Sequence, residues 1–183
     1  IIGFGNTGSA LARKLQGFGC RVMAYDKYKK GFASHYVEEV TLEYLESKSD
    51  IISFHIPLTS ETTDWIRSEW LFSLKNNVTL MNLSRGGIMK IQDVIEGIKS
   101  GKITRFATDV LENERLTSFN DQERQDFEWL NDQENVILTP HVAGWSQESY
   151  MKISKVLGDK IASYVRGGII MTETSEKNRQ IVG

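Results

Sequence analysis

A glycine-rich segment near the beginning of the chain has the spacing of a phosphate-binding turn. Gly3, Gly5 and Gly8 fit the pattern G-x-G-x-x-G, and Asn6 and Thr7 lie between the last two glycines. The pattern allows a tight turn at the first glycine, close approach of the backbone to a pyrophosphate at the second, and close helix–strand packing at the third. A helix that begins here directs its N-terminal N–H groups at the phosphates. Because glycine-rich turns are common, the motif alone is a weak indication of a dinucleotide site.

Asp26 strengthens this interpretation, because it follows the next apolar run, about 20 residues after the glycines. A carboxylate at that place accepts hydrogen bonds from the ribose hydroxyls of adenosine. It also repels a 2′-phosphate, so we expect NAD to bind in preference to NADP. Lys27 beside it keeps the choice of cofactor open, and a structural glycine turn with a surface aspartate is the alternative interpretation.

Further polar segments follow later apolar runs, at the places where ligands bind in open parallel sheets. They are residues 55–59 (His-Ile-Pro-Leu-Thr), 82–87 (Asn-Leu-Ser-Arg-Gly-Gly), 109–114 (Asp to Glu) and 139–141 (Thr-Pro-His). Taken singly, each has an ordinary interpretation. An arginine in a loop is commonly solvated or caps a helix, a lone histidine is commonly a satisfied polar residue, and a glutamate is one acid in a polar stretch.

In their residues and their order, these motifs resemble the D-isomer-specific 2-hydroxyacid dehydrogenases, from Ile1 to about Tyr164. The resemblance implies an NAD-dependent oxidoreductase that transfers a hydride between the nicotinamide and C2 of a D-2-hydroxy acid or 2-oxo acid. Phosphoglycerate is the substrate that we expect from the breadth of the family. The resemblance also implies a homodimer joined through the nucleotide-binding domains.

The resemblance assigns three catalytic roles. Arg85 is expected to hold the substrate carboxylate and polarise the C2 carbonyl, since a planar guanidinium donates two parallel hydrogen bonds. His141 is expected to be the general acid–base, because the pKa of imidazole lies near working pH. Glu114 is expected to be its carboxylate partner, which fixes the tautomer and favours the imidazolium.

The expected cofactor contacts come from the glycine turn and from the segments after each later apolar run. Asp109 is expected to face the nicotinamide carboxamide or ribose, and His55 to belong to the cofactor loop, with a packing role as the alternative. No metal is expected. The expected cofactor-binding set is Gly3, Gly5, Asn6, Thr7, Gly8, Asp26, His55, Ile56, Pro57, Thr62, Leu83, Ser84, Arg85, Asp109, His141 and Gly144.

Some residues depart from the family pattern, and two other functions stay open. Arg115 replaces the proline that usually follows the catalytic glutamate, Lys90 stands where an acid is common, and the segment from Glu114 to His141 is longer than usual. One alternative is a non-catalytic protein that senses NAD. Another is formate dehydrogenase, a relative in which glutamine is the partner of the histidine, and Glu114 argues against it.

The elements that position these residues are predicted from hydrophobic periodicity. Strands are expected at residues 1–2, 21–25, 51–55, 78–83, 106–110 and 136–139, several of them continuous apolar runs typical of strands covered on both faces. Helices are expected around Leu11 to Phe18 with a stop at Gly19, around residues 70–74, around 94–98 ending at Gly101, and from Gln147 to Arg166. Asn120 and Glu123 resemble a capping box for a polar surface helix. The alternation predicts an α/β fold, a Rossmann-type doubly wound parallel sheet.

The domain prediction is an NAD-binding domain at 1–166 and, at 167–183, the start of the C-terminal piece of the substrate domain. The rest of that domain is expected to be missing, because Ile1-Ile2 would begin inside a strand. The formal net charge of −2 gives no electrostatic case for nucleic acid or an anionic membrane. Cys20 is the single cysteine, which excludes an intramolecular disulfide and a cysteine-based metal site. We expect a soluble cytoplasmic protein.

Overall fold

The computed structural model describes residues 1–75 and 77–165. The chain divides into two compact units, Ile1–Ala143 and Gly144–Gly183, and each is described by itself. The predicted boundary at residue 166 stays a prediction, and the segment 167–183 lies outside the described residues.

The first unit is built on parallel strands. β1 (Met23–Ala24) pairs with β2 (Glu38–Glu39), and β3 (Ile51–Phe54), β4 (Val78–Asn82), β5 (Ile103–Thr108) and β6 (Val136–Leu138) form a sheet in that order. Ile2 bridges in parallel to both Tyr25 and Phe54, so the first residues lie between β1 and β3. The strand that enters the glycine turn is therefore central, and the doubly wound parallel arrangement is confirmed.

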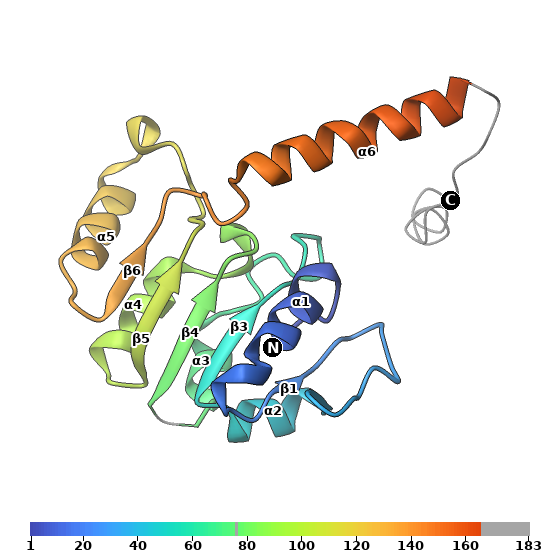
Figure 1. Cartoon of the computed structure of the whole chain (residues 1–183). Coiled ribbons are helices and arrows are strands. Elements are labelled where there is room, and N and C mark those ends of the chain that lie inside the picture. Colours follow the sequence, from blue (N-terminus) through green and yellow to red (C-terminus); the bar gives the residue numbers. More distant parts are fainter. Residues whose placement is uncertain (76, 166–183) are drawn as a thin grey trace. The chain divides into compact units, whose positions relative to one another are not determined.

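Helices cover the two faces of this sheet (Figure 1). Their bounds are α1 Asn6–Lys14, α2 Leu42–Lys48, α3 Ser68–Ser73, α4 Ile91–Lys99 and α5 Asp121–Asn131, with 3-10 turns at Leu15–Phe18, Gly86–Ile88 and Leu116–Ser118. Ala12 of α1 packs in one buried cluster with Ile1, Phe4 and Ala24. A second, larger cluster combines the strand residues Ile52, Phe54, Leu80 and Phe106 with Leu45, Leu71, Val94 and Leu130 of α2 to α5. Two separate cores are what a sheet covered on both faces requires.

Local sequence signals explain where several of these helices begin. Asn120 accepts a hydrogen bond from the N–H of Glu123, whose carboxylate accepts one from the N–H of Asn120, so the predicted capping box is confirmed. The hydroxyl of Thr41 accepts from the N–H of Tyr44 and caps α2, an element that the apolar pattern did not predict. β2, which is two glutamates long, was not predicted either.

The C-terminal end of the first predicted helix differs from the expectation. α1 ends at Lys14 and continues as a 3-10 turn, so Phe18 is 77% exposed and does not join the apolar face. Gly19 stops the element as predicted, with a left-handed φ of 65°.

The second unit contains α6 (Gln147–Val165), which confirms the predicted long helix. Its predicted apolar side is exposed in the structure: Tyr150, Ile153, Leu157, Ile161 and Tyr164 are each at least half accessible. No helix among the described residues has the length and apolar composition needed to cross a membrane.

Candidate functional site

The three glycines of the turn have three different surroundings. Gly3 has a φ of +93°, and a Cβ there would lie 2.4 Å from the carbonyl oxygen of His55. A Cβ at Gly8 would lie 2.0 Å from the carbonyl oxygen of Gly3, whereas one at Gly5 would meet nothing within 4 Å among the described residues. The first glycine thus makes the turn, the third lets α1 approach it, and the second faces open space.

The N-terminus of α1 suits an anionic group. Gly5 is the N-cap residue, and the described part of the chain provides no side-chain cap and no acidic residue in the first turn. The N–H groups of the first turn and the positive end of the helix dipole face outward there. These features fit a pyrophosphate, as the glycine pattern predicts.

Asp26 joins the end of β1 to the glycine turn. Its Oδ2 accepts a hydrogen bond from the N–H of Phe4 at 2.8 Å, and its Oδ1 accepts from the N–H groups of Tyr28 and Lys29 at 2.9 and 2.8 Å. Partial burial raises the pKa of Asp26, but the three backbone donors outweigh it, so the net pKa is below its ordinary value. The carboxylate therefore stays ionised next to the turn.

Lys27, the residue after Asp26, is paired with another carboxylate. Its Nζ pairs with Glu61 at 2.7 Å, and the hydroxyl of Tyr28 donates to the same carboxylate. The lysine that left the cofactor choice open is thus neutralised by a residue of the loop after β3.

The segment after β3 is held largely by its own hydrogen bonds. Thr62 accepts from the N–H of Thr59 at 2.8 Å and donates to the carbonyl of Pro57 at 2.7 Å. Nε2 of His55 lies 2.9 Å from the hydroxyl of Ser53, and Nδ1 is buried with no hydrogen-bond partner in the described range. Burial lowers the pKa of His55 to about 4. His55 is therefore neutral, which fits the packing alternative better than acid–base work.

Asn82 builds the turn that presents Arg85. It is fully buried at the end of β4, where its amide donates to the carbonyl of Arg85 at 3.0 Å and its oxygen accepts from both the N–H and the hydroxyl of Ser84. Ser84 is buried by this contact, whereas Leu83 and Arg85 are exposed. The guanidinium of Arg85 donates to the carbonyl of Ser84 at 2.7 Å.

Asp109 holds the loop that carries His141. This carboxylate is 3% exposed; Oδ1 accepts from the hydroxyl of Thr139 and the N–H of Val142, and Oδ2 accepts from the N–H of Ala143 at 2.8 Å. Burial raises the pKa of Asp109, but these donors bring the net value below the ordinary one. The cofactor contact expected for Asp109 stays a prediction, because the described partners of its carboxylate all belong to the loop at residues 139–143.

Glu114 and His141 form the pair that the resemblance implied. Nδ1 of His141 lies 2.9 Å from Oε2 of Glu114, and both side chains are a little under half exposed. They line a cavity of about 290 Å³ together with Asp109, Leu138 and Thr139. His141 has a φ of +55°, a left-handed conformation that costs free energy in a non-glycine residue and that the surrounding loop must impose.

A backbone hydrogen bond of Arg115 explains why this residue can replace the proline of the family pattern. Its backbone N–H donates to the side-chain oxygen of Asn113 at 3.1 Å, a bond that a proline at this position could not make. The turn after Glu114 is therefore closed by an Asn side chain rather than by a proline ring. Sequence reasoning missed Asn113, although an Asn side chain that accepts a hydrogen bond from the backbone N–H two residues later is a typical feature of turns.

Gly144, the last expected cofactor residue, begins the second unit. Its carbonyl accepts from the hydroxyl of Ser149 near the start of α6. Its contact with the cofactor stays a prediction.

The parallel sheet, the glycine turn and the polar residues after β1, β3, β4, β5 and β6 define a dinucleotide-binding domain of the doubly wound class. Residues 1–143 match the model of the family described as D-isomer specific 2-hydroxyacid dehydrogenase, NAD binding domain. The chain therefore belongs to the D-isomer-specific 2-hydroxyacid dehydrogenase family, and the predicted family and NAD cofactor are confirmed.

Individual relatives agree with this assignment. D-lactate dehydrogenase of Escherichia coli (strain K12) is 37% identical, over 91% of this chain and 53% of that protein. Glyoxylate reductase of Korarchaeum cryptofilum is 34% identical, over 92% of this chain and 49% of that protein. The NAD-complexed D-isomer specific 2-hydroxyacid dehydrogenase of Lactobacillus delbrueckii ssp. bulgaricus superposes with a TM-score of 0.82 and 28% identity, over 92% of this chain and 52% of that one. The chain spans about half the length of the relatives it matches.

Proposed function

We propose that the protein containing this chain is an NAD-dependent D-2-hydroxyacid dehydrogenase. The observation that carries the proposal is the 2.9 Å contact between His141 and Glu114, at the same edge of the sheet as Arg85 and the glycine turn. A nucleotide-binding protein without catalysis needs no acid–base pair at this place. Formate dehydrogenase, in which no proton has to be transferred, does not need it either.

The proposed roles follow from the donors and acceptors that each side chain offers. When bound, NAD supplies the hydride acceptor for oxidation and, as NADH, the hydride donor for reduction. Arg85 binds the substrate carboxylate through two parallel hydrogen bonds. Glu114 at Nδ1 of His141 keeps the hydrogen on that nitrogen, so Nε2 takes the hydroxyl proton during oxidation and returns it to the carbonyl oxygen during reduction.

The substrate that we propose is a small, unphosphorylated 2-oxo acid. Relatives are named D-lactate dehydrogenase, glyoxylate reductase and hydroxypyruvate reductase, and these names favour such acids over phosphoglycerate. Phosphoglycerate stays in the test, because the chain spans about half of each relative and substrate-binding residues can lie in the other half.

The test is a turnover assay on the full-length protein. NADH consumption is followed with pyruvate, glyoxylate, hydroxypyruvate and 3-phosphohydroxypyruvate, and NAD reduction is followed with formate. We expect turnover of at least one of the first three acids. Tight NADH binding without turnover of any acid would favour the non-catalytic NAD-sensing protein, and turnover of formate would favour formate dehydrogenase.

We also propose that the full-length protein is a cytoplasmic homodimer with a small-molecule substrate and with no nucleic-acid or membrane partner. The family resemblance supports the dimer, and the near-neutral charge supports the absence of nucleic acid. Light scattering across micromolar concentrations measures the mass directly, and a monomer at every concentration would contradict the dimer.

A further inference from the structure

The segment that follows Arg85 is held by backbone contacts from two neighbouring loops. On one side, the N–H of Ile66 donates to the carbonyl of Ile88 at 2.9 Å, and the N–H of Lys90 donates to the carbonyl of Ile66 at 3.1 Å. On the other side, a Cβ at Gly86 would lie 1.8 Å from the carbonyl oxygen of Leu111. The loop after β3 and the loop after β5 thus enclose the residues that carry Arg85.

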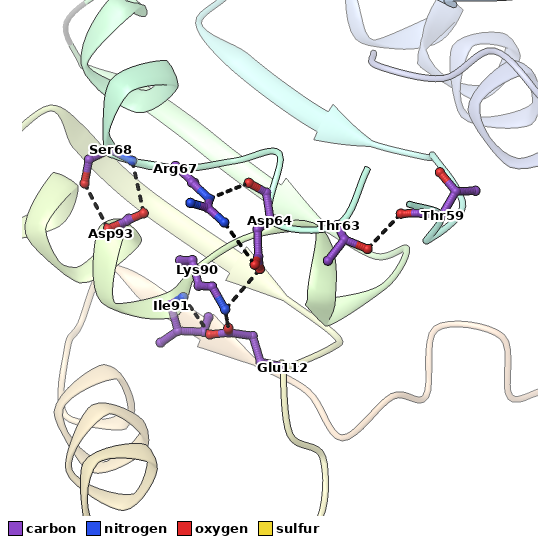
Figure 2. Close-up of polar contacts among 9 residues, drawn as sticks. All are labelled: Thr59, Thr63, Asp64, Arg67, Ser68, Lys90, Ile91, Asp93 and Glu112. Carbon is purple, nitrogen blue, oxygen red and sulfur yellow. Dashed lines mark hydrogen bonds and ion pairs between the residues drawn. The ribbon is translucent and has the colours of Figure 1, made fainter. Parts of the chain in front are cut away.

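Lys90 lies where these loops meet, as Figure 2 shows. Its Nζ is 3.0 Å from Oδ1 of Asp64, in the loop after β3, and 2.9 Å from Oε1 of Glu112, in the loop after β5. The two carboxylates, Glu112 first and then Asp64, raise the pKa of Lys90. One ammonium group therefore bridges two loops that approach from opposite sides.

Glu112 extends the connection to a helix. Its second oxygen, Oε2, accepts a hydrogen bond from the N–H of Ile91 at 3.0 Å and so supplies the cap that α4 does not receive from its own N-cap residue, Lys90. The same carboxylate therefore binds the side chain of Lys90 and the first N–H of the helix that follows it. The loop after β5 cannot shift without losing both contacts.

Glu114 is two residues from this connection. In between, the amide of Asn113 lies 3.3 Å from both oxygens of Glu123, in the first turn of α5. Three consecutive side chains thus contact three different parts of the domain. Glu112 contacts Lys90 and α4, Asn113 contacts α5, and Glu114 contacts His141. The position of Glu114 depends on the two anchors before it.

We propose that Lys90, through Asp64 and Glu112, is a positioning residue that sets Arg85 and Glu114 relative to each other in the reaction. The inference rests on the proposed dehydrogenase function. Lys90 is five residues from Arg85 along one loop, and Glu112 is two residues from Glu114 along the other. Without the ammonium group Asp64 keeps the guanidinium of Arg67 at 3.1 Å, whereas Glu112 loses its cation. The side-chain link between the two loops is then lost, and the loop after β5 is held less firmly against the segment that carries Arg85.

Stability alone does not account for this arrangement. The side chains of Lys90, Glu112 and Asp64 are 43%, 32% and 22% exposed, and ion pairs that solvent reaches contribute little to folding. Catalysis is far more sensitive to position than folding is, because a misplacement of about 1 Å can lower a rate about a hundredfold. A loss of turnover that exceeds any loss of stability is therefore the signature of a positioning role.

The experiment compares Lys90→Met, Lys90→Arg and a matched control, Lys75→Met, in the full-length protein. Lys75 pairs with Asp50 at 2.6 Å, but this pair lies at the opposite edge of the sheet, before β3 and β4. For Lys90→Met we expect kcat to fall about tenfold and KM for the 2-oxo acid to rise, while the Kd of NADH stays within about twofold of wild type. Lys90→Arg should recover most of the turnover, and Lys75→Met should keep wild-type kcat.

Hydrogen exchange provides a readout that needs no turnover. In Lys90→Met, amide exchange should accelerate in residues 85–90 and 111–115, and in Lys75→Met these segments should exchange as in wild type. Wild-type kcat and wild-type exchange in Lys90→Met would overturn the proposal, as would equal effects of the two methionine variants or a lack of recovery in Lys90→Arg. If the wild-type protein itself reduces no 2-oxo acid, the dehydrogenase function fails, and exchange alone decides whether Lys90 ties the loops.

Discussion

The second and third glycines of the turn allow a matched test, because the same substitution should have different consequences at positions three residues apart. In Gly8→Ala the new Cβ would lie 2.0 Å from the carbonyl oxygen of Gly3, whereas real Cβ contacts are essentially never under 3.0 Å. The turn and α1 must therefore separate by about 1 Å. Overpacking of this kind costs about 1–3 kcal/mol, and alanine recovers about 1 kcal/mol of that through its helix propensity. Because the obstacle is backbone rather than a flexible side chain, we expect a net loss of about 2 kcal/mol.

Gly5→Ala should change the stability little and weaken the binding of the cofactor. Gly5 has φ −76° and ψ −157°, an extended conformation open to alanine, and a Cβ there meets nothing within 4 Å among the described residues. Alanine gains about 0.4–1 kcal/mol from its smaller freedom in the unfolded chain, but Gly5 is the N-cap residue of α1, where glycine is preferred to alanine by a similar amount. The free energy of unfolding should therefore stay close to that of wild type. The added methyl group occupies the space through which the pyrophosphate approaches, so we expect NADH to bind at least about tenfold more weakly.

Two measurements on the full-length protein separate these effects. Urea denaturation gives the free energy of unfolding of each variant, and NADH fluorescence titration gives its Kd. A Gly8→Ala protein as stable as wild type would show that the helix can move away from the turn at little cost. A Gly5→Ala protein that binds NADH normally would show that the open space in front of Gly5 is not the path of the cofactor.

Three further predictions concern single side chains of the site. His141→Ala should lower turnover by about a hundred- to ten-thousandfold while the Kd of NADH changes little, and near-normal turnover would mean that another group transfers the proton. Asp109 has a lowered pKa in the folded protein, so its stabilising contribution is complete above its unfolded pKa of about 3.9 and is lost as the pH falls below that value. The stability difference between wild type and Asp109→Asn, measured by urea denaturation, should therefore shrink below about pH 4, and a constant difference would contradict this cause. Because Asp26 is ionised and Lys27 is paired with Glu61, NADH should bind more tightly than NADPH in calorimetry, and equal affinities would refute that assignment.

Elements whose signals are local could be predicted from the sequence. The capping box at Asn120 and Glu123 begins α5 as expected, because both of its hydrogen bonds join residues three positions apart. The surroundings of the three glycines were also predictable. The pattern itself specifies a tight turn at the first, close approach of the backbone to a pyrophosphate at the second, and helix–strand packing at the third. The His141–Glu114 contact followed from motifs in a known order, although 27 residues separate the two side chains.

What could not be predicted depends on contacts between distant segments. Only Leu45 of α2 is buried, so this helix lacks the apolar stripe that periodicity detects. Lys90 was noticed solely as a departure from a family pattern, because its partners Asp64 and Glu112 are 26 and 22 residues away in the chain and become neighbours only after three loops have packed. The contacts of Asp109 within the protein could not be predicted either, since a motif gives no sign that three donors at residues 139–143 converge on its carboxylate.

The central position of Ile2 has a consequence for folding kinetics. Its backbone groups bond to Ser53 and His55, about 50 residues along the chain, and contacts of that sequence separation form slowly. A partly folded chain can therefore assemble β3 to β6 while the glycine turn is still undocked and no cofactor site exists. NAD stabilises only states that contain its site, so it would act after the rate-limiting step of folding. Saturating NAD should accordingly slow unfolding of the full-length protein and leave its refolding rate nearly unchanged.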